Sequence, residues 1–380
     1  MPDEIMKVIV FHVSIISLLL FTCQSQDPEI ARKSQNEQKI KSMEMIELNL
    51  KKQLLTERQE PFITREFDPY LNGRWIGKAI SYGFYRKGQA PGIKGPNESE
   101  MLQDLKIILN HWNLIRVYGS DKNSEKVLKV IRKNNLPVKV MLGVWLENET
   151  KFPKRKQENI KEVMKAIRLA NEYSEIISAI NVGNETQVFW SAHKMEMETL
   201  IHYIRVVRNN TSVPVTTADD YNFWNKPESK SVAAEVDFIV VHIYPLWNGQ
   251  TLENSIDWMS NIFFNEIKKF HPEKTLVLGE IGWATNYDST KTGDGQQGAL
   301  VKGEVGLAAQ EKFLLELSRW IDENQVTTFL FEAFDEPWKG GGEASSPNEI
   351  EKHWGVFYEN RMPKKSFENY LKKYNIEQKH

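Results

Sequence analysis

Cysteine and net charge are what this sequence has least of. The chain of 380 residues contains one cysteine, Cys23, so no disulfide can form within a molecule. Lys and Arg number 49 and Asp and Glu number 51, which leaves a formal charge of −2. Because there is neither a basic excess nor a basic stripe, nothing favours nucleic-acid binding, and we expect no nucleic-acid partner.

Long apolar runs are also scarce, and the longest lies near the N-terminus. It extends from Val8 to Phe21 after Lys7, which is short for a bilayer span but suits the core of a signal peptide. The letters LFTC at 20–23 resemble a bacterial lipoprotein cleavage site. We expect residues 1–23 to be a signal peptide that ends at an acylated Cys23 and anchors an exported protein to a membrane, in the periplasm or at the cell surface. The alternative is an ordinary secretory signal with an incidental cysteine.

The next segment, residues 24–63, is rich in charge and carries a weakly amphipathic helical pattern that Pro61 interrupts. We expect it to be a spacer between the anchor and a catalytic body at residues 64–380.

In that body, short apolar runs alternate with longer amphipathic segments, which indicates βα units around a parallel sheet. The expected strands are residues 78–84, 114–120, 138–146, 176–185, 213–220, 238–245, 275–283 and 327–336. Eight such units predict an α/β fold of the (β/α)₈ TIM barrel type. An open doubly wound sheet is the alternative, but its nucleotide-binding version needs a glycine-rich loop after the first strand, and none is present.

The active site of a TIM barrel lies at the carboxyl ends of its strands. In this chain those ends carry many acids and aromatic residues. Carboxylates can cleave a glycosidic bond, and flat rings can stack on sugars, so the pattern favours a carbohydrate site. In strand order the residues are Tyr82; Tyr118; Trp145 and Glu147; Asn184 and Glu185; Asp219 and Asp220; His242 and Tyr244; Glu280 and Trp283; and Glu332, Asp335, Glu336 and Trp338.

Several motifs in this order resemble glycoside hydrolase family 17, which contains endo-1,3-β-glucanases. They are RVYGS (116–120), NVGNE (181–185), IYP (243–245), LGEIGW (278–283), FDEPWK (334–339) and HWGVF (353–357). ISYGFYRKGQAPG (80–92) is similar to the bacterial branch of the family. The letters GWAT at 282–285 depart from the plant pattern Gly-Trp-Pro-Ser, which weakens inferences about that loop but not about Glu280.

The resemblance implies retaining hydrolysis of β-1,3-glucan, with Glu185 as the general acid/base and Glu280 as the nucleophile. Such an enzyme needs two carboxyl groups about 5–5.5 Å apart. A separation beyond ~8 Å would exclude this mechanism. For substrate binding the resemblance and the strand ends together select Tyr82, Tyr118, Trp145, Asn184, Tyr244, Trp283, Glu336, Trp338 and Lys339; Trp145 and Trp338 could instead be ordinary packing residues.

Asn184 and Glu185 pose a geometric problem, because neighbouring side chains of a regular strand point to opposite faces. If both serve the substrate, the strand must bulge or twist at its tip. We therefore predict irregular backbone at residues 183–186.

Other polar residues at the strand ends have simpler interpretations. Glu332 is as well explained by a structural role as by a functional one, and His242 by internal hydrogen bonding. The letters TADD at 217–220, which include Asp219 and Asp220, suggest a calcium or substrate contact only faintly, and a solvated loop is the favoured interpretation. No second His or acid shows the spacing of a metal site, so we expect no metal and no cofactor.

Three functions remain open. The first is an endo-acting β-1,3-glucan hydrolase acting on a laminarin-like polysaccharide. The second is a transglycosylase that uses the same two glutamates, and the third is an inactive carbohydrate-binding protein. The sequence leaves chain-length preference and oligomeric state undecided.

Overall fold

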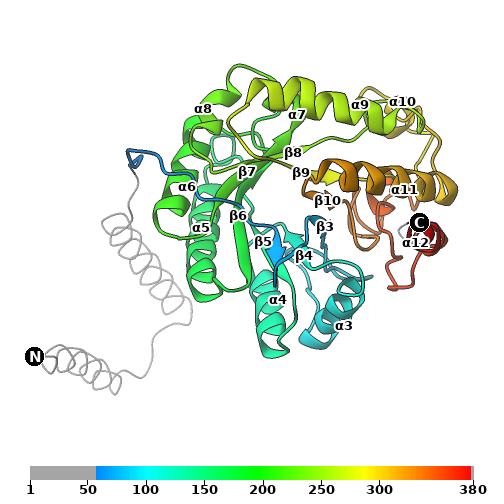
Figure 1. Cartoon of the computed structure of the whole chain (residues 1–380), viewed down its shortest axis with the longest axis horizontal. Helices are drawn as coiled ribbons and strands as arrows, with labels where there is room; N and C mark the ends of the chain where they lie inside the picture. Colours follow the sequence, from blue (N-terminus) through cyan, green and yellow to red (C-terminus); the bar gives the residue numbers. More distant parts are fainter. Residues whose placement is uncertain (1–56, 378–380) are drawn as a thin grey trace, which may run out of the picture. The chain divides into compact units, whose positions relative to one another are not determined.

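The structure is a computed structural model, and it describes residues 57–377. Eight parallel strands form a closed barrel in the order β10-β3-β4-β5-β6-β7-β8-β9, with helices around it (Figure 1). The predicted (β/α)₈ barrel is confirmed. The strands are β3 (Lys78–Ser81), β4 (Leu114–Val117), β5 (Lys139–Val144), β6 (Ile177–Asn184), β7 (Val215–Asp220), β8 (Ile239–His242), β9 (Leu276–Ile281) and β10 (Thr328–Leu330).

The last strand closes the barrel on the first, with Phe329 of β10 opposite Ala79 of β3. It is shorter than predicted, because regular pairing stops at Leu330. Beyond it, Phe331 still donates its amide hydrogen to Ile281, and Ala333 donates to Ser81. The chain therefore stays at the barrel rim and delivers the residues that follow to the mouth.

Helical segments follow the strands along the chain. They are α3 (Glu98–Ile108), α4 (Lys122–Lys133), α5 (Arg155–Glu172), α6 (Met197–Asn209), α7 (Tyr221–Trp224), α8 (Ser229–Ala233), α9 (Ser255–Asn261) with the π-helix η2 (Ile262–Lys268), α10 (Gln297–Leu300), α11 (Leu307–Asn324), the 3₁₀ helix η3 (Ile350–Lys352) and α12 (Lys365–Glu377). Two caps fix their starts locally: Asn97 and Glu100 form a capping box on α3, and Asp121 caps α4.

The barrel interior is apolar below the catalytic rim. Its core cluster is Phe67, Ile76, Ala79, Leu114, Met141, Ala179, Ala218, Phe238, Val240, Val277 and Phe329. Phe67 precedes the first strand and stacks on Phe238 with ring centroids 4.6 Å apart. Burying such a ring contributes about 1.5–3 kcal/mol, so the chain before β3 is part of the folded barrel.

The chain before Phe67 also binds the barrel. Arg208 lies over the ring of Phe62 at 3.9 Å and donates to the carbonyl of Ile63. The backbone N–H of Arg65 donates to Asp237 at 2.8 Å. Residues 57–63, for which the sequence predicts a spacer, thus contact the catalytic body. Two short strands, β1 (Tyr70–Leu71) and β2 (Arg74–Trp75), pair antiparallel just before the barrel.

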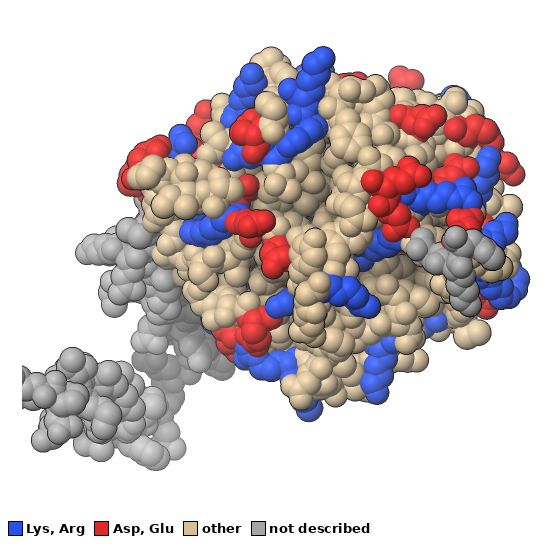
Figure 2. Space-filling view, in the orientation of Figure 1, with Lys and Arg blue, Asp and Glu red and all other residues tan. Residues whose placement is uncertain are grey.

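The predicted signal peptide, Cys23 and the helical pattern of residues 24–56 lie outside the described residues. Within residues 57–377, no helix has the length and apolar character needed to cross a membrane. The face shown in Figure 2 mixes Lys and Arg with Asp and Glu, as expected for a formal charge of −2.

Candidate active site

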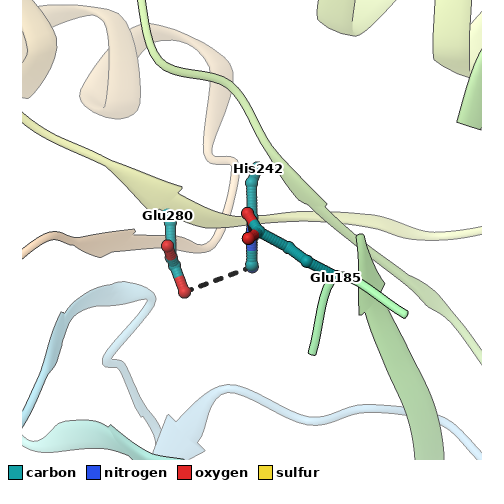
Figure 3. Close-up of side chains that lie close together, drawn as sticks. All are labelled: Glu185, His242 and Glu280. Atoms are coloured by element: carbon teal, nitrogen blue, oxygen red, sulfur yellow. Dashed lines mark hydrogen bonds and ion pairs between the residues drawn. The ribbon is translucent and has the colours of Figure 1, made fainter. Parts of the chain in front are cut away.

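Two glutamates from different strands meet at the mouth of the barrel. Glu185 directly follows β6, and Glu280 lies in β9. One carboxylate oxygen of each and a ring nitrogen of His242 all lie within 4.8 Å of one another (Figure 3). The two carboxylates are therefore far inside the ~8 Å limit for direct attack on a carbon held between them.

The strand that carries Glu185 is irregular at its end, as predicted. Its register against β7 shifts between Asn181 and Asn184. Gly183 has φ 80° and Glu185 has φ 53°, both in the left-handed region. A positive φ is uncommon for a glutamate and is held here by the surrounding structure. The consequence is that Asn184 and Glu185 both face the mouth instead of alternating.

Arg116 links the end of β6 to the end of β9. Its Nη2 donates to Asn184 Oδ1 at 2.6 Å, and its Nη1 donates to Glu280 Oε1 at 3.0 Å. Nη1 also lies 2.9 Å from the carbonyl of Gly279 and 3.0 Å from His242 Nε2. Arg116 is almost fully buried, so its permanent positive charge acts on Glu280 with little screening.

Glu280 is held in its ionised form. Burial alone raises its pKa, but the charges of His242 and Arg116 and a hydrogen bond from the Tyr244 hydroxyl, 2.8 Å from Oε2, lower it below the usual value. Burial lowers the pKa of His242 to about 4. The imidazole is thus neutral at neutral pH, and the charge that stabilises the Glu280 carboxylate there is that of Arg116.

Glu185 has the opposite electrostatic environment. Burial raises its pKa well above the usual value, and the negative charges of Glu280 and Asp220 add to the effect. Its Oε1 lies 2.8 Å from His242 Nδ1. Two neighbouring carboxyls with oppositely shifted pKa values are what an acid and a nucleophile need at the same pH.

Hydrogen-bond accounting fixes the tautomer of His242. Arginine can only donate, so Nε2, which faces Arg116, must accept. The neutral ring then carries its hydrogen on Nδ1 and donates it to Glu185 Oε1. This leaves Glu185 Oε2 as the oxygen for the acidic proton.

The same three residues have the composition of a metal site, because Glu185, His242 and Glu280 each offer a ligand atom. Both ring nitrogens of His242 already face partners, however, and the Arg116 guanidinium lies 3.0 Å from Glu280. A second cation would lie against that fixed charge. The cluster therefore fits a proton-transfer site better than a metal site.

A cleft of about 820 Å³ opens beside Glu280, within the usual size range of small-molecule sites. Of the substrate-binding residues predicted from the sequence, Tyr82, Tyr118, Trp145, Asn184, Glu336, Trp338 and Lys339 line it. The indole N–H of Trp145 donates to Glu147 at 3.0 Å, and that of Trp338 donates to Glu336 at 2.9 Å. Each ring is therefore held in one orientation on the cleft wall.

Two of the predicted substrate-binding residues do not line the cleft. Tyr244 lies beside Glu280 and donates a hydrogen bond from its hydroxyl to Glu280 Oε2 at 2.8 Å, which is the contact expected of a tyrosine that keeps the nucleophile ionised. Trp283 is only 1% exposed, packs against Phe313 and donates its N–H to the carbonyl of Glu304. The structure therefore does not bring Trp283 together with the cleft residues.

The strand-eight acids form a buried ion cluster. The cation is Lys339, whose Nζ lies 3.0 Å from both oxygens of Glu332 and 2.7 Å from Glu336 Oε2. Glu332 is fully buried, and burial and the charge of Glu336 raise its pKa well above the usual value. It orients Lys339 from below, which is a structural role, whereas Glu336 and Lys339 reach the cleft.

The two aspartates after β7 are used as backbone hydrogen-bond acceptors. Asp219 accepts the N–H groups of Gln187 at 2.7 Å and Val188 at 3.1 Å. Asp220 caps α7 through Asn222. Both side chains are buried and hold backbone N–H groups at the rim, so the predicted solvated loop is wrong.

Comparison with known proteins identifies the family. The model of the BtgE/BtgC glycoside hydrolase domain matches residues 79–355. The chain belongs to this family. The match spans most of the chain and includes both glutamates.

Among curated relatives of this BtgE/BtgC domain, a protein from Aspergillus niger that is named "Putative glucan endo-1,3-beta-glucosidase btgC" is 30% identical over 69% of the chain and 38% of the relative. A glucan 1,3-β-glucosidase from Schizosaccharomyces pombe is 28% identical over 70% of the chain and 79% of the relative. The chain thus spans well under half the length of the Aspergillus protein.

Solved structures share the fold of the BtgE/BtgC domain. An endo-laminarinase from Formosa has a TM-score of 0.66 at 23% identity, covering 78% of this chain and 88% of the other. A family 17 β-1,3-glucanosyltransferase from Rhizomucor miehei has a TM-score of 0.59 at 21% identity, covering 76% and 96%. Both likenesses show a shared fold.

Sequence reasoning missed two residues that organise this BtgE/BtgC site. The sequence patterns do not single out Arg116, which lies within a strand, and they predict internal hydrogen bonding for His242 without a link to the glutamates. A signal was available for Arg116, because an arginine inside a four-residue strand of otherwise apolar residues must find a buried partner. No comparable signal singled out His242 as the residue between the two acids.

Proposed function

We propose that this protein is a retaining, endo-acting hydrolase of β-1,3-glucan, with Glu185 as general acid/base and Glu280 as nucleophile. The observation that carries the proposal is the pair itself. Its oxygens lie within 4.8 Å, and the two pKa values are shifted in opposite directions. A short separation suits direct attack by a carboxylate, whereas an inverting enzyme needs room for a water molecule between substrate and base.

In the first step, a carboxylate oxygen of Glu280 forms a bond to the anomeric carbon while the bond from that carbon to the glycosidic oxygen breaks. Glu185 gives its proton to the departing oxygen, and the shortened chain leaves with a new hydroxyl. In the second step, Glu185, now a carboxylate, takes a proton from water. The resulting hydroxide bonds to the anomeric carbon, and the bond to Glu280 breaks.

Neighbouring residues stabilise the charged form of each glutamate during this cycle. Arg116 and Tyr244 keep Glu280 ionised before attack. When Glu185 has lost its proton, the N–H of His242 can stabilise the new carboxylate. Asn184 is fixed by Arg116 at the cleft wall, where the family resemblance has it bind the 2-hydroxyl of the sugar at the cleaved bond. The other proposed substrate contacts are Tyr82, Tyr118, Trp145, Glu336, Trp338 and Lys339.

The substrate class is supported by the cleft and by the relatives. Tyrosine and tryptophan rings and fixed polar groups line the cleft together, which suits pyranose rings with apolar faces and hydroxyl edges. The relative from Aspergillus niger is named "Putative glucan endo-1,3-beta-glucosidase btgC", and the relative from Schizosaccharomyces pombe is named "Glucan 1,3-beta-glucosidase".

Transfer of the glycosyl group to a sugar instead of water is the second candidate, favoured by the shared fold of the Rhizomucor miehei glucanosyltransferase. The test is a product analysis with purified protein and a β-1,3-glucan oligosaccharide. Shorter products with new reducing ends support hydrolysis, and products longer than the substrate support transfer. Glu185→Gln and Glu280→Gln should abolish either outcome.

A matched control for these substitutions is Glu235→Gln. Glu235 is also buried and pairs with Arg205 at 2.7 Å, but it does not line the cleft. It should retain activity. If wild-type protein binds β-glucans but never turns them over, the protein is an inactive carbohydrate-binding protein and the proposal fails.

We further propose that the protein belongs to the bacterial branch of family 17 and is exported as a lipoprotein. The support is the sequence alone: the segment 80–92, the apolar run Val8–Phe21 and the position of Cys23. Metabolic labelling with a radioactive fatty acid should mark the wild-type protein and not Cys23→Ser. Equal labelling of both would contradict acylation at Cys23.

A further inference from the structure

Exposed aromatic side chains gather on two loops at the catalytic rim. Among the described residues, the large aromatic side chains left most exposed are Phe189 at 74%, Trp190 at 51%, Tyr70 at 50% and Phe152 at 49%. Phe152 lies between β5 and α5, and Phe189 and Trp190 lie between β6 and α6. Three of these four rings are therefore on the loops that follow the neighbouring strands β5 and β6, and Tyr70 is in the β1–β2 hairpin.

The loop that carries Phe189 and Trp190 is internally braced. Its ends are joined by the N–H of Met195, which donates to the carbonyl of Thr186 at 3.0 Å. Its base is fixed by Asp219, which accepts the N–H groups of Gln187 and Val188. Val188 is buried, and the two aromatic residues come directly after it. The rings of Phe189 and Trp190 are thus exposed on a loop whose backbone is fixed by hydrogen bonds.

The two loops are joined to each other and to the cleft. His193 Nδ1 lies 3.0 Å from Glu147 Oε2, and the Asn148 side chain donates to the carbonyl of Lys194. Both His193 and Glu147 line the cleft. The His193 ring also packs edge to face on Trp145, with centroids 4.8 Å apart. The exposed rings therefore belong to a surface that continues outward from the cleft wall.

We propose that Phe152, Phe189 and Trp190 form an outer glucan-binding surface that holds parts of a long β-glucan chain beyond the cleft. The proposal rests on the proposed function for the identity of the sugar. Apolar rings exposed to water have an energetic cost, and flat aromatic rings stack on pyranose faces. The occupant is a glucan because the surface continues from the cleft, so a chain bound at Glu280 can extend onto it.

The test separates binding of long chains from cleavage of short ones. Phe189→Ala/Trp190→Ala and Phe152→Ala are compared with Tyr70→Ala, which removes an equally exposed ring outside these loops. Binding to insoluble linear β-1,3-glucan is measured by depletion in a Glu280→Gln background, so that the polymer is not consumed. Turnover of the polymer and of a short β-1,3-oligosaccharide is measured with Glu280 intact.

We expect the Phe189→Ala/Trp190→Ala variant to bind the polymer at least about tenfold more weakly than the wild type. Its KM for the polymer should rise, its kcat/KM for the short oligosaccharide should change less than about twofold, and Tyr70→Ala should match wild type. Unchanged polymer binding would overturn the proposal. Equal losses on polymer and oligosaccharide would also overturn it, because the rings would then be part of the cleft.

Other occupants give different results. A change in sedimentation behaviour of the double variant, without a change in polymer binding, would assign the surface to a second copy of the chain. Loss of binding to phospholipid vesicles alone would assign it to a membrane. If wild type cleaves no β-1,3-glucan but binds the polymer through these rings, the proposed catalytic function fails and the binding surface stands.

Discussion

Replacing Arg116 by Met tests the electrostatic account of the nucleophile. At 3.0 Å and an effective dielectric constant of 20, the attraction between the guanidinium and Glu280 is about 5 kcal/mol. Removing one partner of a buried ion pair costs about 3–5 kcal/mol of folding stability. The variant also loses the hydrogen bonds that hold Asn184 and His242. We expect kcat/KM to fall by about 10²–10³.

The pH dependence gives the sharper readout. Glu280 must be ionised to attack, and its folded-state pKa lies below the ordinary value. Without Arg116 that pKa rises, so the acid limb of the kcat/KM profile should move to higher pH. A depressed folded-state pKa stabilises the protein above the unfolded pKa, and this contribution is lost as pH falls through the folded value. The stability gap between wild type and variant should therefore narrow in acid.

Arg208→Met is the matched control. Arg208 is a similarly buried arginine that pairs with Asp237 at 3.1 Å, outside the cleft. It should lower stability in guanidinium unfolding without moving the pH profile of the remaining folded enzyme. If Arg116→Met leaves the acid limb in place, or Arg208→Met moves it equally, the assignment of Arg116 as the charge that holds Glu280 ionised is wrong.

Three further changes have defined outcomes. Glu185→Gln should lose most activity on glucans but keep cleavage of aryl glycosides whose leaving groups need no proton; equal losses on both substrates would argue against an acid role. Gly183→Ala puts a side chain at φ 80°, with its Cβ 3.0 Å from Thr186. It should lower the free energy of unfolding by about 1–3 kcal/mol and also lower kcat, as measured by chemical unfolding and steady-state kinetics. Phe67→Ala should cost about 3–5 kcal/mol in thermal or chemical unfolding, whereas the exposed Tyr70→Ala should be nearly neutral.

The sequence predicted the barrel and both glutamates because these depend on local pattern and strand order. Apolar runs mark the strands, and parallel strands bring their carboxyl ends to one rim. The adjacency of Asn184 and Glu185 even indicated the irregular strand end, since a regular pleat cannot present both.

What the sequence did not show depends on side-chain direction after the strands end. Trp283 follows Glu280 by three residues, yet its ring turns into the wall and packs on Phe313. His242 sits between the glutamates because register shifts relative to β9 place it there. The exposure of Phe189 follows from a loop braced by Asp219, through hydrogen bonds to residues 32 and 31 positions away along the chain. No local pattern reveals such contacts.

The central claim is that Glu280 bonds covalently to the sugar. Inactivation with a 2-deoxy-2-fluoro-β-laminaribiosyl fluoride, followed by digestion and mass spectrometry of the peptides, tests it most directly. The account predicts a fluoroglycosyl adduct on the peptide that contains Glu280, located at that residue. An adduct on another carboxylate, or release of α-configured products without any adduct, would contradict it.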